Sequence, residues 1–257
     1  MPVESVFPAL ERLLPNVQKP VQYVGGELNA VVKDWDSVDV RWVLMYPDAY
    51  EVGLPNQGVQ ILYEVLNERD DVLCERTYSV WPDLEQLMRG SGVPQFTLDA
   101  HRPVGAFDVF GLSFATELGY TNMLTALDLA GIPLHAVDRD DSHPIVIAGG
   151  HAAFNPEPIA TFIDCAILGD GEEAALRVSD IVADWKRAGR PGGRVELRVV
   201  RHPCNPVVVA HPDVVGVPRF VRAVEQRVHA CGVIGQVRPR RHARGKRRSC
   251  GEVVDSD

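Results

Sequence analysis

Short apolar runs alternate with amphipathic segments from residue 41 to about residue 188. The runs have the length of buried strands, and they cover residues 41–46, 72–80, 108–114, 143–148 and 164–168. Apolar positions at helical spacing predict helices over residues 57–67, 82–89, 120–130, 158–162 and 171–187. Strands that alternate with helices in this way are typical of α/β domains. We therefore predict a doubly wound, Rossmann-like or flavodoxin-like five-stranded parallel sheet with strand order 2-1-3-4-5.

Two segments flank this domain, which we place at residues 41–188. Residues 1–40 are predicted as a lead-in arm, with one or two helical turns at 7–14 and either an irregular arm or a hairpin at 21–32. After Gly189 the periodicity stops, and residues 189–257 are predicted as a basic, poorly ordered tail. A valine run at 207–209 has the composition of a strand, but no neighbouring unit organises it.

The net charge of −9 hides an asymmetry, because acidic residues dominate up to residue 185 and basic residues dominate from 186 to 248. The basic segment is either an arm for nucleic acid or another polyanion, or simply a solvated tail. No aromatic side chain lies among the arginines at 238–248 to stack on bases, which argues against nucleic acid.

The spacing of the cysteines and the hydropathy of the chain indicate the cellular compartment. Five cysteines are scattered, and the closest pair, Cys231 and Cys250, are 19 positions apart. Such spacing does not suggest a disulfide framework or a local metal site, so we expect a reducing cytoplasm and no structural metal. The first residues do not form a signal peptide, and no apolar run is long enough to span a bilayer.

Polar and glycine-rich loops follow four of the predicted strands. Right-handed crossovers bring these loops to one edge of a parallel sheet, where ligands bind in such folds. Glycines there let the backbone approach a ligand, and helix N-termini attract anions. Our candidate cofactor-binding residues at this edge are Asp48, Tyr50, Glu51, Gly53, Asn56, Ser113, Glu117, Asn122, Gly149, Gly150, Asn155, Glu157, Gly169, Asp170 and Gly171. An alternative is that these are ordinary turn glycines and helix caps.

Several motifs in order resemble a known family. The stretches PDAYEVG, GVQILYEVLN, TELGYTNMLTALDLAGIPL, GGHAAFNPEPIATFID and ILGDGEEA are similar to the N-terminal, cobalamin-binding-like region of radical S-adenosylmethionine (radical SAM) proteins. The resemblance covers roughly residues 6–190. It implies a Rossmann-like domain that precedes a barrel with a [4Fe-4S] cluster and S-adenosylmethionine, and a small-molecule cofactor, cobalamin, as a candidate ligand. The radical SAM core is then the expected protein partner.

One position departs from the cobalamin pattern. Cobalamin domains of the mutase type carry D-x-H-x-x-G, whereas residues 48–53 here read Asp-Ala-Tyr-Glu-Val-Gly, with Tyr50 in the place of histidine. A phenol with a pKa near 10 is a poor cobalt ligand. Binding of cobalamin without a lower protein ligand, and loss of cobalamin binding, both stay open. Ser113 and Gly149-Gly150 match the later cobalamin motifs, with Ala115 where leucine is usual.

The cluster motif C-x-x-x-C-x-x-C, which leaves one iron open for S-adenosylmethionine, does not occur in the sequence. The composition changes where the resemblance fades, and we interpret this as a shifted or truncated reading frame near residue 195. We therefore predict no catalytic residues and a binding or docking role as part of a radical SAM protein. A stand-alone small-molecule-binding or regulatory module is the alternative. An independent enzyme using Glu51, Glu117 or Glu157 is disfavoured, because no nucleophile–base pair accompanies them.

Overall fold

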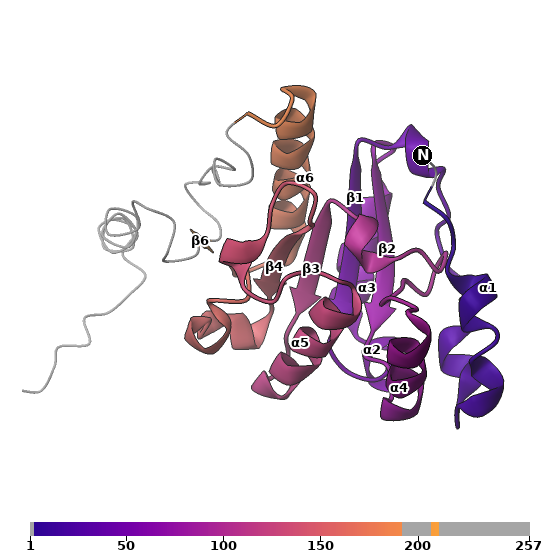
Figure 1. Ribbon diagram of the computed structural model, residues 1–257. Helices are drawn as coiled ribbons and strands as arrows, with labels where there is room; N and C mark the ends of the chain where they lie inside the picture. Colours follow the sequence, from indigo (N-terminus) through magenta and orange to yellow (C-terminus); the bar gives the residue numbers. More distant parts are fainter. Residues whose placement is uncertain (1–2, 192–206, 211–257) are drawn as a thin grey trace, which may run out of the picture. The chain divides into compact units, whose positions relative to one another are not determined.

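The computed structural model describes residues 3–191 and 207–210. Five strands pair in parallel in the order β2-β1-β3-β4-β5 (Figure 1). Their bounds are β1 Val40–Tyr46, β2 Val72–Tyr78, β3 Val109–Ser113, β4 Ile145–Gly149 and β5 Cys165–Leu168. The predicted α/β fold and strand order are confirmed. A sixth strand, β6 Val207–Ala210, pairs antiparallel with β5, so the valine run does have a neighbour in the sheet.

Helices cover both faces of the sheet. The longer helices are α3 Gln57–Asn67, α4 Pro82–Ser91, α5 Tyr120–Leu129 and α6 Gly171–Arg187. Their starts follow ordinary capping chemistry: the Asn56 side chain accepts a hydrogen bond from Val59 N at 3.0 Å, and α4 begins with a proline. A further short helix, α2 Tyr50–Gly53, lies directly after β1.

The connection between β4 and β5 differs from the prediction. The helix expected over 158–162 is replaced by two 3-10 turns, His151–Phe154 and Glu157–Ile159. Pro156 and Pro158 stand before and at the start of the second turn, where a proline is tolerated, but the segment is too short to extend beyond a 3-10 turn before β5.

The alternation of side chains along each strand separates two apolar clusters. Phe110, Leu112, Met123 and Leu127 belong to the cluster on the α5 face of the sheet. The cluster on the other face combines alternate strand residues with side chains of α3 and α6, and it contains Trp42, Leu44, Tyr63, Ile147, Ile167 and Val178. Because strands β1, β3, β4 and β5 are buried on both faces, their sequences are nearly continuous apolar runs.

The lead-in packs against the domain. It forms α1 Phe7–Leu10 and 3-10 turns at Leu14–Asn16, Pro20–Tyr23 and Trp35–Ser37, so residues 21–32 are irregular and form no hairpin. Leu10 and Tyr23 are buried with Leu84 and Met88 of α4. The prediction that the domain begins at residue 41 and ends at 188 stays a prediction, and most of the basic tail lies outside the described residues.

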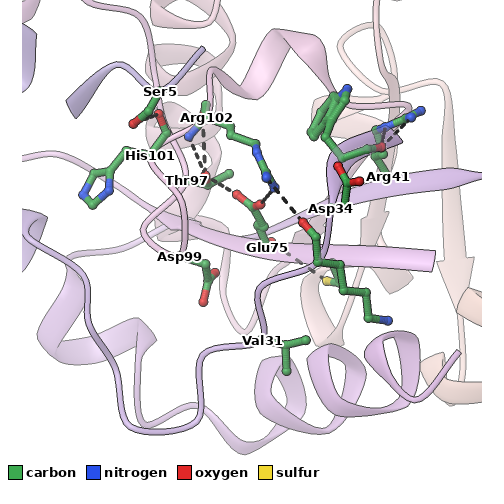
Figure 2. A network of polar contacts seen from close by, with 12 residues as sticks. Ser5, Val31, Asp34, Arg41, Glu75, Thr97, Asp99, His101 and Arg102 are labelled. Carbon is green, nitrogen blue, oxygen red and sulfur yellow. Dashed lines mark hydrogen bonds and ion pairs between the residues drawn. The ribbon is translucent and has the colours of Figure 1, made fainter. Parts of the chain in front are cut away.

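Buried charges join β2 to the segments that cover its outer edge (Figure 2). The Arg102 guanidinium pairs with the Glu75 carboxylate, which also accepts a hydrogen bond from the Thr97 hydroxyl. Arg76 pairs with Asp99 at 2.7 Å. At the same edge, Arg76 N donates to Asp99 Oδ2 at 2.6 Å and Leu98 N donates to Arg76 O at 2.7 Å, so backbone groups of the edge strand find partners.

Candidate functional site

A cavity of about 430 Å³ opens at the carboxyl ends of β1, β3, β4 and β5. It lies on the face of the sheet covered by α3 and α6. Its apolar lining comes from strand residues pointing to that face and from the two helices, namely Trp42, Leu44, Ile147, Ile167, Leu62 and Ala175. An apolar cavity of this volume, at the edge where α/β folds bind ligands, suits a small organic group.

Several glycines line this cavity, and one of them makes room for the side chains of its apolar floor. At Gly111 in the middle of β3, a Cβ atom would lie 2.9 Å from Leu44 Cδ2 and 3.2 Å from Trp42 Cζ3. At Gly149 a Cβ would have no neighbour closer than 4.0 Å, so the space there is open. Gly58 and Gly171 also line the cavity, from the starts of α3 and α6. A glycine inside a strand often marks a place where a ligand approaches the backbone closely.

The Gly149-Gly150 pair has two different functions. Gly149 presents open backbone to the cavity, whereas Gly150 has φ +88° and its Cβ would lie 2.5 Å from Phe114 O. A side chain at Gly150 would strain the backbone and clash with Phe114, the residue after β3, so glycine is needed for the turn itself.

The rim of the cavity is acidic. Asp170 and Glu172, at the start of α6, line it together with Ser113 and His151, and no lysine or arginine is among the described residues of the lining. The Asp170 side chain does not cap α6 with a hydrogen bond. A helix N-terminus attracts anions, but the neighbouring carboxylates oppose that attraction here. This rim is therefore poorly suited to a nucleoside di- or triphosphate.

The structure brings together six of the predicted site residues around this cavity: Ser113, Gly149, Gly150, Gly169, Asp170 and Gly171. Two others, Asp48 and Asn122, line a second cavity of about 300 Å³. The rest line neither cavity: Tyr50, Glu51, Gly53, Asn56, Glu117, Asn155 and Glu157.

Tyr50 points toward the lead-in. Its hydroxyl donates to Glu27 Oε1 at 2.6 Å, and its ring packs edge-on against Tyr78 of β2 with centroids 5.8 Å apart. Burial, followed by the hydrogen bond and charge of Glu27, raises the pKa of Tyr50 to about 12. The phenol is therefore protonated and engaged at neutral pH, and it does not fit the function of a cobalt ligand.

The neighbours of Tyr50 have local structural functions. Glu51 forms an exposed ion pair with Lys19 at 2.6 Å, and Lys19 lowers the pKa of that carboxyl. Gly53 packs so tightly that a Cβ would lie 2.4 Å from the Tyr78 ring. Glu117 and Glu157 lie in the first turns of short 3-10 segments and are exposed, and Asn155 ends one such segment.

Sequence reasoning missed the floor of the cavity. Trp42 is only 2 % exposed, and its indole Nε1 donates to Ser179 Oγ on α6 at 2.9 Å, which fixes the orientation of the ring. Gly111, inside an otherwise apolar strand, was the signal that could have identified this region. Cys165 lies buried in β5, and burial raises the pKa of its thiol.

No three histidine, cysteine or acidic side chains gather to hold a metal ion within residues 3–191 and 207–210. In the same residues, no helix has both the length and the apolar character to cross a membrane.

A family profile described as "Radical SAM proteins, N-terminal" matches residues 58–203. The chain belongs to this family. The match begins at the first residues of α3 and takes in β2 to α6, so it includes the loops of Ser113, Gly149-Gly150 and Gly169–Gly171. Searches of curated proteins and of solved structures found no match. The profile ends within residues 192–206, outside the described residues, so the predicted frame break near 195 stays a prediction.

Proposed function

We propose that this radical SAM N-terminal domain is a non-catalytic binding module that holds cobalamin through the cofactor's nucleotide tail. The observation that supports this most is the 430 Å³ cavity, whose apolar floor would take the planar base. Ser113 and Gly149-Gly150, which match cobalamin motifs, line this same cavity.

The residues of this chain would bind and orient the cofactor. Trp42, Leu62 and Ile167 would exclude water from the base, and the backbone at Gly149 and Gly169 would allow a close approach of the ribose. When bound, cobalamin supplies a cobalt centre able to carry an alkyl group. Its lower face would receive no ligand from the D-x-Y-x-x-G position, because Tyr50 is directed to Glu27.

We further propose that the domain serves a radical SAM core, which in the family brings the [4Fe-4S] cluster and S-adenosylmethionine. The buried free thiols of Cys74 and Cys165 are consistent with our expectation of a reducing cytoplasm.

A second candidate is a stand-alone module that binds another small molecule. The residues that line the cavity belong to the described α/β domain, as expected if the domain binds its ligand by itself. Its acidic rim favours neutral or cationic ligands over polyphosphates.

A titration of the full chain with hydroxo-, methyl- and adenosylcobalamin, followed by visible absorption and calorimetry, tests the proposal. We expect saturable binding. Gly149→Val should weaken it at least tenfold, because the new side chain fills open space on the cavity side of β4 without backbone strain. Gly90→Val is the matched control, since Gly90 is exposed on α4 and its Cβ would also meet nothing.

The absence of saturable binding by a chain with a folded far-UV spectrum would overturn the cobalamin assignment and favour the second candidate. Equal affinities of Gly149→Val and the parent would instead show that cobalamin binds somewhere else.

A further inference from the structure

The second cavity lies at the same edge of the sheet but on the opposite face. Its lining comes from the loop after β1, the loop between β2 and α4, and the start of α5. Asp48 and Glu85 supply carboxylates, and Ala126, which belongs to the apolar cluster on the α5 face, closes the wall. The cavity of about 300 Å³ is large enough for a small organic molecule.

Gln95 shows which kind of polar group this cavity offers. The side chain is 1 % exposed, and its amide nitrogen donates to Thr77 Oγ1 at 2.8 Å and to Tyr78 O at 2.9 Å. Both amide hydrogens are thereby used. No described residue donates to its Oε1, so the polar group that Gln95 leaves for the cavity is an acceptor.

A buried hydroxyl adds a second unpartnered group. Ser79 Oγ is inaccessible to solvent and makes no hydrogen bond, although Ser79 lines the cavity. A buried polar atom without a partner costs about 1–3 kcal/mol. Because this oxygen is inaccessible, a ligand in the cavity does not contact it, and the acceptors that face the cavity are those of Asp48, Glu85 and Gln95.

The charge of the lining is negative. Asp48 accepts a hydrogen bond from Ala49 N at 2.7 Å and forms no ion pair in the described part of the chain. Glu85 Oε1 forms an ion pair with Arg89 Nε at 2.9 Å. No lysine, arginine or histidine is among the described residues that line this cavity.

Trp81 adds an aromatic surface suited to cations. Trp81 is 40 % exposed, and the Lys19 ammonium lies 5.2 Å from the centroid of its ring, so the indole already attracts one ammonium group. The N-terminus of α4 would favour an anion, but Pro82 has no amide hydrogen and the first turn contains Asp83 and Glu85.

From these observations we propose that the second cavity binds a small ligand with a protonated primary amine. In this proposal the ammonium group lies between Asp48 and Glu85, where its three hydrogens bond to the two carboxylates and to Gln95 Oε1. The alkyl part of the ligand lies against Trp81 and Ala126. This site is independent of the cobalamin proposal, because the two cavities lie on opposite faces of the sheet.

Three probes with the same carbon chain and different charge test the site: butylammonium, 1-butanol and butyrate. The full chain is titrated with each, and the indole N–H resonance of Trp81 is followed by NMR. We expect butylammonium to shift this resonance saturably at millimolar concentration and to bind at least tenfold more tightly than the other two. Added salt should weaken the binding, since it screens charge.

Asp48→Asn should weaken the binding of butylammonium at least tenfold, because the substitution removes the negative charge while Oδ1 can still accept a hydrogen bond from Ala49 N. Glu117→Gln, an exposed carboxylate at the same edge that lines neither cavity, should have no effect. Gly149→Val should also leave butylammonium binding unchanged, which separates this test from that of cobalamin.

Four results would overturn the proposal. Tighter binding of butyrate would identify an anion site at the α4 N-terminus, and equal binding of 1-butanol would identify a merely apolar cavity. No saturable shift with butylammonium, or full affinity in Asp48→Asn, would show that the acceptors do not form an amine site.

Discussion

Tyr50 donates its hydroxyl to the Glu27 carboxylate at 2.6 Å, and this contact joins α2 to the lead-in. Lys19 and Glu51 join the same two segments by an exposed ion pair. Trp81 N donates to the Tyr23 hydroxyl at 3.1 Å, which extends the contact to α4. The position that carries a cobalt-binding histidine in mutase-type cobalamin domains thus secures the lead-in here.

Tyr50→Phe should lower the free energy of unfolding by about 1–2 kcal/mol, because it removes a hydrogen bond to a charged acceptor that is partly exposed. Urea unfolding at neutral pH measures this. Tyr46→Phe is the control, since no hydrogen bond of the Tyr46 hydroxyl is found among the described residues. A loss of the same size in both variants would contradict the assignment.

The contribution of Tyr50 to the free energy of unfolding should decrease at alkaline pH. Burial and Glu27 raise the folded-state pKa to about 12 from an ordinary value of 10.0. A raised pKa contributes stability that is complete below about pH 10 and is lost as the pH rises toward about 12. The difference between parent and Tyr50→Phe should therefore shrink over this range, and a difference independent of pH would argue against the mechanism.

Arg102→Met should destabilise the fold by about 3–5 kcal/mol at neutral pH, because it leaves the Glu75 carboxylate buried without its partner. Adding Glu75→Gln should recover most of the loss. The control is Arg187→Met, whose pair with Asp39 is exposed, so its loss should change the free energy of unfolding little.

Acid should partly rescue Arg102→Met. Burial raises the pKa of Glu75, and Arg102 is one of the groups that opposes this shift. Without Arg102, the folded state binds a proton more readily than the unfolded state, so stability rises as the pH falls toward the unfolded-state pKa. Chemical unfolding across this range checks the sign, and a loss that grows in acid would contradict it.

Substitution by alanine should affect the stability of the fold differently at the two adjacent glycines. Gly150→Ala should cost at least about 1–3 kcal/mol, since its φ is +88° and the new Cβ would lie 2.5 Å from Phe114 O. Gly149→Ala should stay within about 1 kcal/mol of the parent. Thermal unfolding of the two variants measures this, and equal costs would contradict the different backbone functions of the pair.

Leu10→Ala should cost about 2–5 kcal/mol, because Leu10 is fully buried against α4 and its loss leaves a cavity. Val21→Ala, in the same lead-in but 70 % exposed, should have little effect. If Leu10→Ala were as stable as the parent, the lead-in would not be an integral part of the fold.

The sequence by itself determined the strands, their order and the glycine-rich edge. Apolar runs such as residues 41–46 and 108–114 are long and uninterrupted, and parallel strands buried on both faces require that composition. Right-handed crossovers then leave few topologies. The loops of Ser113, Gly149 and Gly169 were found for the same reason, since each directly follows a strand.

Only the tertiary structure decided which of those residues share a cavity and what the others contact. The direction of Tyr50 depends on Glu27, 23 positions away in an irregular segment with no periodicity to predict it. The floor at Trp42 and Gly111 depends on the register between β1 and β3. Local patterns specify which face a side chain takes, but contacts between distant segments depend on how the packed chain brings them together.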